Sequence, residues 1–423
     1  MIEYKKTDKR GIEMDKVKIG WIGLGGRGSG LLKLVLNHMD DVEIVGVCDL
    51  YEDRMEQGRD LVKEKTGKTP IAVTDYKKLL EIDEIEAIIT PSAWEAHVDI
   101  CVNSMLAGKY VATEVGGAYS IEDCFRLVET YEKTKVPCMM LENCCYNKEE
   151  LTILNMIKKG LFGEIVHCEG GYRHDLRDEV ALGNINRHYR LRNYLSRNAE
   201  VYPTHELGPI AKYININRGN RMLYLVSMAS KSRGVTDWIK KNKGEDFENA
   251  NADFALGDIV ITLIKCANGE TITLTHDTSL PRPYSRGNLV QGTNGIWSED
   301  NRGILLDGTI DEPSWSHKYT SIDEYYGEHL HPLWNDYNIK DAHGGMDYHV
   351  LRAFIEAVKA KTQTPIDAYD TAAWMSITPL SEASIKGGSI PVEIPDFTNG
   401  KWQNREPYVR SKYCLEEVCE DMF

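Results

Sequence analysis

Two stretches in the middle of the chain are rich in side chains that can take up and release protons. They are Gly171–Arg177, with the sequence GYRHDLR, and Val201–His205, with the sequence VYPTH. Tyr172, Tyr202 and His205 provide two phenols and one imidazole, which can exchange protons with the hydroxyl groups of a bound alcohol. These side chains indicate a site at which protons are moved on a sugar.

A glycine-rich turn near the start of the chain indicates a second kind of chemistry. The apolar segment 17–22 leads into the sequence GLGGRG of Gly23–Gly28, and a helical pattern of leucines follows. In a dinucleotide-binding turn, Gly23 permits the tight turn, Gly25 lets the backbone approach a pyrophosphate, and Gly28 lets the helix pack close to the strand. The N-terminus of the helix then offers N–H groups to the phosphates.

An acidic residue follows at the distance expected for a ribose ligand. The predicted strand 42–48 ends at Asp49, about 20 residues past the glycines, where a carboxylate can hold the hydroxyls of the adenosine ribose. Because a carboxylate repels a 2′-phosphate, Asp49 favours NAD over NADP. The alternative interpretation is a glycine turn that binds no ligand, with Asp49 serving only as a helix cap.

Strands and helices alternate through the first third of the chain. Short apolar segments at 86–90, 109–114 and 136–141 are predicted strands with helices between them. The alternation predicts a doubly wound parallel sheet, in which ligands bind beyond the carboxyl ends of the strands. Side chains that follow these strands are therefore expected to face the cofactor. The residues that we assign to the NAD site are Gly23, Gly25, Gly26, Arg27, Gly28, Asp49, Trp94, His97, Glu114 and Asn143.

Past Tyr146 the pattern changes and long strands dominate. It predicts a mixed or antiparallel open sheet with helices on one face, in an α+β domain that carries the substrate. We therefore expect an α/β Rossmann domain at 1–146 and an α+β domain at 147–423, whose C-terminal helices can pack back on the first domain. The predicted elements of the second domain are helices at 149–159, 206–213, 346–359 and 370–385, strands at 164–169, 222–229, 258–265, 271–276 and 289–291, and surface loops at 240–249 and 299–312.

The composition excludes several classes of partner. The 423 residues carry 65 acidic and 50 basic side chains, and the net charge of −15 disfavours a nucleic-acid partner. The charged N-terminus lacks the apolar core of a signal peptide, and no run of about 18 apolar residues predicts a membrane span. The ten cysteines show no CxxC spacing, so we expect a cytoplasmic protein with neither disulfides nor a metal site.

Several strings of residues carry a resemblance to a known family. The chain resembles the Gfo/Idh/MocA family of sugar and inositol oxidoreductases and, within it, glycoside hydrolase family 109, the NAD-dependent α-N-acetylgalactosaminidases. The resemblance runs from Val17 to about Pro407. The strings that carry it are ENCCY (142–146), GYRHDLR (171–177), YPTH (202–205), NINRGNR (215–221), RPYSR (282–286) and HGGMD (343–347).

Two departures from the wider family bear on the activity. Simple dehydrogenases of that family carry Glu-Lys-Pro where this chain has Glu114-Val115-Gly116, so their catalytic lysine is absent here. Glu206 stands where relatives often place glycine, and the segment 178–198 is short. The missing lysine disfavours ordinary alcohol oxidation, and the other departures leave the identity of the sugar open.

The resemblance implies a hydrolysis that depends on NAD without net oxidation. Bound NAD would take a hydride from C3 of the sugar, a base would remove the acidified C2 proton, and the C1 substituent would leave by elimination. Water would then add, and NADH would return the hydride. This route does not use the pair of carboxylates on which most glycosidases depend.

The matching strings also imply roles for individual residues. Tyr172 is expected to be the base at C2, and His205 with Tyr202 to act at the C3 hydroxyl. A phenol has a pKa of about 10, so we expect a nearby cation, namely Arg173, His174 or the nicotinamide ring, to lower the pKa of Tyr172. The residues assigned to substrate binding are Tyr284, His174, Arg177, His343 and Asp347.

Plainer interpretations exist for most of these residues. Tyr172 could be a strand aromatic packed in the core, and His205 a histidine satisfied at a helix start. His343 and Asp347 are four residues apart and could simply pair across a helical turn. Within the loop after Tyr172, Asp175 and Arg177 are expected to pair and stiffen the backbone.

Three functions are therefore considered for the chain. The first is the glycosidase, the second is an NAD-dependent dehydrogenase of a sugar, amino sugar or cyclitol, and the third is a cofactor-binding sensor without catalysis. The absence of a lysine after Glu114 favours the first over the second, and the density of tyrosine and histidine disfavours the third. The expected partner is a small saccharide, and a homodimer formed through the long strands is left open.

Overall fold

The chain forms two compact units, each assembled from separate stretches of sequence. The computed structural model describes residues 16–309, 315, 317–335, 337, 339, 341–405 and 408–423. The N-terminal segment on which the expected absence of a signal peptide depends lies outside the described residues. The first unit consists of Met1–Glu114, Glu129–Leu141 and Ile339–Asp367, and the second of Val115–Val128, Glu142–Asn338 and Ala368–Phe423. The single boundary expected after residue 146 stays a prediction.

The first unit contains the predicted doubly wound parallel sheet. Its six strands lie in the order β3-β2-β1-β4-β5-β6, and every neighbouring pair is parallel. This is the strand order of a Rossmann fold, with the change of direction between β1 and β4. The elements are β1 (Val17–Ile22), α1 (Gly26–His38), β2 (Val42–Cys48), α2 (Glu52–Thr66), β3 (Ile71–Val73), α3 (Lys77–Leu80), β4 (Ala87–Thr90), α4 (His97–Leu106), β5 (Tyr110–Thr113), β6 (Cys138–Met140), α13 (Asp341–Gly344) and α14 (Met346–Ala360), and α5 (Ile121–Thr134) belongs to both units.

The central strands of this sheet are mostly apolar and almost entirely buried, as expected when helices cover both faces. Ile19, Trp21, Ile88 and Ile89 are completely buried. Helix α14 packs against β1 and α1, although more than 300 residues of sequence separate them. The sheet is therefore completed by a segment from the last quarter of the chain.

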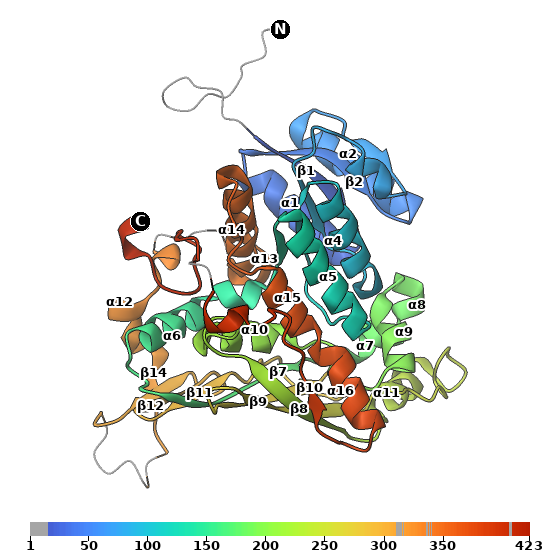
Figure 1. The fold of residues 1–423 in the computed structure, drawn as a ribbon. Helices are drawn as coiled ribbons and strands as arrows, with labels where there is room; N and C mark the ends of the chain where they lie inside the picture. The colour runs from blue at the N-terminus through green and yellow to red at the C-terminus, as the bar shows by residue number, and fades with distance from the viewer. Residues whose placement is uncertain are drawn as a thin grey trace. The chain divides into compact units, whose positions relative to one another are not determined.

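The second unit contains a nine-stranded mixed sheet, in the order β14-β13-β12-β11-β7-β10-β9-β8-β15. Only the β7–β10 pair is parallel, and the other neighbours are antiparallel. Helices α10 and α16 pack on one face of this sheet (Figure 1). The elements are α6 (Lys148–Lys158), β7 (Ile165–Arg173), α7 (Arg177–Ala181), α8 (Gly183–Asn186), α9 (Tyr189–Ser196), α10 (Thr204–Tyr213), β8 (Met222–Ala229), α11 (Gly234–Lys243), β9 (Ile259–Cys266), β10 (Thr271–Asp277), β11 (Leu289–Gly292), β12 (Gly295–Ser298), β13 (Gly303–Leu306), β14 (Thr320–Ser321), α12 (Tyr326–His329), α15 (Ala368–Met375), α16 (Ile377–Lys386) and β15 (Val392–Glu393).

The opposite face of this sheet carries exposed apolar side chains. Residues of β8 and β9 alternate between buried and exposed positions, as expected when only one face is covered. On the uncovered face, Tyr224, Met228, Ile261 and Leu263 expose between 44% and 63% of their surface. Met228 lies opposite Ile261, and Leu263, opposite Val226, lies two residues further along β9. We call these four residues the open-face patch.

Several predicted elements of the second half differ from the structure. The segment 240–249, expected to be a loop, begins inside α11, and 299–312, also expected to be a loop, contains β13. The helix expected at 370–385 is two helices, α15 and α16, which meet at Ser376. At 303–306, glycine and charged neighbours suggested a loop, but pairing with β12 and β14 makes this segment a strand. Within the described part of the chain, no helix combines the length and the apolar character that crossing a membrane requires.

Candidate functional site

The three predicted catalytic side chains come together in the second unit. Tyr172 lies near the end of β7, and Tyr202 and His205 flank the start of α10, which packs on β7. The rings of Tyr172 and Tyr202 are 4.3 Å apart between centroids, and those of Tyr172 and His205 are 5.6 Å apart. The Tyr202 hydroxyl lies 3.4 Å from Nε2 of His205. Each tyrosine is 7% exposed, so this cluster is nearly closed to bulk water.

Glu142 holds the other nitrogen of the His205 ring. Its Oε1 lies 2.8 Å from Nδ1 of His205 and also accepts the backbone N–H of Cys144. Burial alone would raise the pKa of Glu142, but His205 and these hydrogen bonds hold it below its usual value. The carboxylate is therefore ionised, Nδ1 donates to it, and Nε2 is left to accept a proton. Glu142 is part of the ENCCY string, yet no role was predicted for it, because its partner lies 63 residues away.

The charge state of Tyr172 differs from the prediction. Burial raises the pKa of Tyr172, and the nearby Arg190 opposes this effect only in part. The Arg190 guanidinium lies 5.8 Å from the Tyr172 ring centroid and 5.2 Å from that of Tyr202. Of the expected cations, Arg173 instead lies 3.5 Å from Asp300, and burial lowers the pKa of His174, so His174 is neutral. The expectation that a neighbouring cation brings the pKa of Tyr172 below its usual value is therefore wrong within this unit.

Two of the predicted substrate ligands adjoin the same cluster. Nδ1 of His174 lies 3.3 Å from the Tyr172 hydroxyl, and the His174 ring meets the Tyr284 ring edge-on at 5.2 Å. Tyr284 is 49% exposed, so one side of its ring is accessible from solvent. The predicted pairing of Arg177 with Asp175 is confirmed, with two hydrogen bonds of 2.8 and 2.6 Å. Arg177 is thus engaged by its own loop.

The other two predicted substrate ligands lie in the first unit. His343 Nδ1 lies 2.8 Å from Asp347, which confirms the pairing across a helical turn. Asp347 in turn accepts two hydrogen bonds from Arg27, of 2.6 and 2.8 Å, and Arg27 also pairs with Glu114 at 2.9 Å. Burial opposes ionisation of Asp347, yet the pairing with Arg27 and His343 holds its pKa far below the usual range. Two predicted cofactor ligands and two predicted substrate ligands thus form one ionic cluster.

The glycine turn has the form that a dinucleotide requires. Gly23 has a φ of +107°, and a Cβ there would lie 2.6 Å from the Pro91 carbonyl oxygen. A Cβ on Gly28 would lie 2.2 Å from the Gly23 carbonyl oxygen, so the strand and α1 approach too closely for any side chain. A Cβ on Gly26 would meet nothing within 4 Å, so space remains above the first turn of α1. These residues fit a pyrophosphate at the helix N-terminus.

Asp49 lies where the ribose ligand was predicted, at the end of β2. Its two oxygens accept the backbone N–H groups of Leu24, at 2.7 Å, and Tyr51, at 2.9 Å. An ionised carboxylate has about four acceptor positions, so two remain for ribose hydroxyls. Asp49 therefore also braces the glycine turn.

The remaining predicted cofactor residues are buried. Nε2 of His97 lies 3.1 Å from the Ser92 carbonyl oxygen, and burial lowers the pKa of His97 to about 4, so it is neutral. Trp94 is 4% exposed, and Asn143 is 2% exposed and lies in the second unit. Cys144 is also fully buried, and burial raises the pKa of its thiol, so it is not an activated nucleophile.

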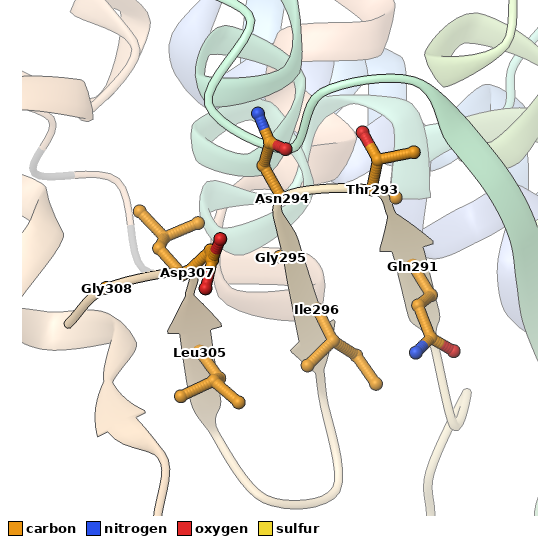
Figure 2. Close-up of a pocket in the computed structure, with 10 residues that line it drawn as sticks. Gln291, Thr293, Asn294, Gly295, Ile296, Leu305, Asp307 and Gly308 are labelled. Atoms are coloured by element: carbon orange, nitrogen blue, oxygen red, sulfur yellow. The ribbon is translucent and has the colours of Figure 1, made fainter. Parts of the chain in front are cut away.

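A hollow of about 300 Å³ lies elsewhere in the second unit, at the ends of β11, β12 and β13 (Figure 2). Thr293, Asn294 and Asp307 line it together with backbone of the connecting turns. Thr293 Oγ1 accepts the Glu164 N–H, and the Asn294 N–H is bonded to the Phe162 carbonyl. None of the predicted site residues lines this hollow, and it gives no indication of chemistry.

Two family models match successive segments of the chain. Residues 17–142 match the family model described as an oxidoreductase family with an NAD-binding Rossmann fold. Residues 146–404 match the model described as the C-terminal domain of glycosyl hydrolase 109. The first match makes the first unit a domain for a nicotinamide cofactor.

Individual relatives cover nearly the whole chain. A glycosyl hydrolase family 109 protein from Stenotrophomonas maltophilia is 40% identical over 421 residues, covering 93% of this chain and 91% of the relative. An alpha-N-acetylgalactosaminidase from Tannerella forsythia is 38% identical over 417 residues, covering 92% and 88%. The crystal structure of a myo-inositol 2-dehydrogenase from Lactobacillus plantarum aligns with a TM-score of 0.66 at 14% identity, over 90% of this chain and 100% of that one, and shows the shared fold.

Proposed function

This chain belongs to glycosyl hydrolase family 109, and we propose that it cleaves α-N-acetylgalactosaminides in a reaction that depends on NAD without net oxidation. The substrate class is that named for the relative from Tannerella forsythia. The observation that carries the proposal is the pairing of Glu142 with His205 beside two buried tyrosines. That set can move protons at two neighbouring carbons of a sugar.

NAD, when bound, supplies a two-electron acceptor for C3 of the sugar that is restored at the end of each cycle. The glycine turn and the first N–H groups of α1 would hold its pyrophosphate, and Asp49 would hold its adenosine ribose. The carboxylate of Asp49 disfavours the 2′-phosphate of NADP. Glu114, braced by Arg27, is a further contact that we propose for the cofactor.

His205 is proposed as the base at the C3 hydroxyl. Because Glu142 fixes a proton on Nδ1, Nε2 is free to accept the hydroxyl proton and to give it back later. The Tyr202 hydroxyl, 3.4 Å from Nε2, orients the same group.

Tyr172 is proposed as the base at C2. Burial disfavours the phenolate of Tyr172, so this anion forms only when the hydroxyl proton is transferred away. The Arg190 guanidinium stabilises the negative charge on Tyr172 as it develops. His174, neutral and 3.3 Å from the Tyr172 hydroxyl, can accept that hydroxyl's proton and so prepare the base. His174, Tyr202 and Tyr284 would contact the sugar, which is a small saccharide.

The proposal is tested with a p-nitrophenyl α-N-acetylgalactosaminide, by recording nitrophenolate release and NADH absorbance together. Release of nitrophenolate without accumulation of NADH is expected, and the loss of this activity after removal of the nucleotide supports the dependence on NAD. Continuous NADH formation with added NAD and free sugars would instead identify a dehydrogenase. Nucleotide binding without either reaction would identify a sensor.

The elimination step has its own test. Hydrolysis in deuterated water is expected to place deuterium at C2 of the released sugar, since the C2 proton is exchanged during the cycle. Tyr172→Phe is expected to abolish this exchange together with hydrolysis. Hydrolysis without incorporation at C2 would contradict the role of Tyr172.

A further inference from the structure

One group of potential metal ligands is formed by folding alone. Among the described residues, Glu142, Cys144 and His205 place a carboxylate oxygen, a thiol sulfur and an imidazole nitrogen within 4.8 Å of one another. Glu142 and Cys144 follow β6, and His205 comes from the first turn of α10, so the spacing along the sequence gave no signal. Carboxylate, thiolate and imidazole are the ligands that Zn²⁺ takes in proteins.

The three side chains have unused capacity to coordinate an ion. Oε2 of Glu142 is completely buried and makes no close hydrogen bond among the described residues, although the Thr204 side chain interacts with the carboxylate. Among the described residues, the Cys144 thiol makes only a long contact, of 3.7 Å, to the side-chain Oδ1 of Asn143. Buried polar atoms are nearly always satisfied, so the oxygen without a close hydrogen bond is an observation that points to a missing ligand.

Charge balance favours a divalent cation at this position. Burying a cation is costly unless anions offset it. As ligands, a Glu142 carboxylate and a Cys144 thiolate together carry two negative charges and an imidazole carries none, so a divalent ion would complete a group with no net charge. Binding of the ion would release the thiol proton.

We propose that Glu142, Cys144 and His205 bind one Zn²⁺ ion per chain and that this ion inhibits the enzyme by occupying His205. The inhibition rests on the proposed function, because it requires His205 to act on the substrate. Three protein ligands leave a fourth position open for water or another ligand, unlike structural zinc sites, which are closed by four protein ligands. His205 is the only one of the three whose side chain is partly exposed, at 12%, so the ion enters from its side.

Binding is tested without reference to activity, on NAD-loaded protein treated with a chelator and then titrated with Co²⁺ and Zn²⁺. One tightly bound ion per chain is expected, and the Co²⁺ form should show the near-ultraviolet absorption of a thiolate–cobalt bond. Cys144→Ala should lose this band and bind Zn²⁺ at least tenfold more weakly. Cys145→Ala is the matched control, because Cys145 is an adjacent and equally buried cysteine outside the group.

Inhibition is tested in the nitrophenyl glycoside assay. Zn²⁺ should inhibit the wild type and Cys145→Ala, a chelator should restore activity, and Cys144→Ala should need at least tenfold more Zn²⁺ for the same inhibition. If Cys144→Ala does not fold, Cys144→Ser keeps the size of the side chain and removes the soft ligand. The absence of a thiolate–cobalt band, or equal Zn²⁺ binding by the wild type and the Cys144 variant, overturns the proposal. If the enzyme hydrolyses no glycoside, the proposed function fails while the binding result still decides the site.

Discussion

Two buried glutamates near His205 hold opposite charge states. Glu142 is ionised because it pairs with the imidazole, whereas burial raises the pKa of Glu200 to about 8 and keeps it protonated. Glu200 accepts only the Tyr202 N–H, and its second oxygen has no partner among the described residues. Glu206 is also completely buried, and burial raises its pKa well above the usual value. Glutamate is therefore an anion at position 142 and a neutral acid at positions 200 and 206.

Replacing Glu142 tests the role of its charge. Glu142→Gln keeps the size of the side chain but removes the anion that fixes the proton on Nδ1 of His205. We expect kcat for glycoside hydrolysis to fall by roughly 100-fold or more, with KM changed by less than about threefold. Glu200→Gln is the control, since an amide resembles the protonated acid, and it should keep most of the activity. Equal losses in the two variants would show that burial, and not the charge of Glu142, matters.

Glu200 is expected to make stability depend on pH. Between the ordinary glutamate pKa of 4.5 and the folded value of about 8, the folded chain holds a proton that the unfolded chain has lost. The free energy of unfolding therefore falls as the pH rises through this range, by about 1.4 kcal/mol per pH unit for one proton. Urea unfolding at several pH values should give a smaller fall for Glu200→Gln than for the wild type. An equal fall in the free energy of unfolding with pH for the wild type and Glu200→Gln would contradict the protonated state assigned to Glu200.

The glycine turn and α1 act as one element in the first unit. The close approach at Gly28 fixes where the helix starts relative to β1, and Asp49 braces the turn through the Leu24 N–H. The N-terminal N–H groups of α1 are thus aimed at one position before any ligand arrives. Preorganisation of this kind lowers the cost of binding.

A methyl group at Gly28 should disrupt this arrangement. Because the added Cβ of Gly28→Ala would lie 2.2 Å from the Gly23 carbonyl oxygen, we expect the affinity for NAD to fall at least tenfold. Gly30→Ala is the matched control: it lies in the same helix, and its added Cβ would meet nothing within 4 Å. Isothermal titration with NAD measures both variants. Unchanged affinity in Gly28→Ala would mean that the turn does not hold the cofactor.

The elements that could be predicted from the sequence are those with a clear pattern. The strands at 17–22, 42–48 and 222–229 have the bounds predicted for them, because each is an apolar run between charged or glycine-rich segments. The helices α7, α8 and α9 were missed, because they are short and their packing decides their structure. Arg190 lies in α9, so its place beside the Tyr172 ring was not predicted either. The pairing of Glu142 with His205 could not be predicted either, since it depends on how α10 packs against the segment that begins at Glu142.

At the scale of the whole molecule, an acidic chain carries one strongly apolar surface. The net charge of −15 opposes association in general, whereas the open-face patch exposes four large apolar side chains on two adjacent strands. Exposed apolar surface of this kind marks sites of association. The observation favours the homodimer that the sequence left open.

We expect two copies of the chain to associate through the open-face patch. Light scattering coupled to size exclusion should give the mass of two chains for the wild type and of one chain for the double variant Ile261→Lys, Leu263→Lys. Both residues point away from the covered face, so NAD binding should be kept. A wild type of single-chain mass would contradict the prediction, and a dimeric double variant would place the interface elsewhere.

The first unit is assembled from segments that lie far apart in the sequence, and this affects its biosynthesis. Asp347 and α14 are translated more than 200 residues after the strands that they complete. At about 5–20 residues per second, a nascent chain must wait roughly ten seconds or more before α14 can pack against β1 and α1. The growing polypeptide is therefore expected to depend on chaperones at the ribosome, and a truncated gene product ending after β6 should accumulate as insoluble material.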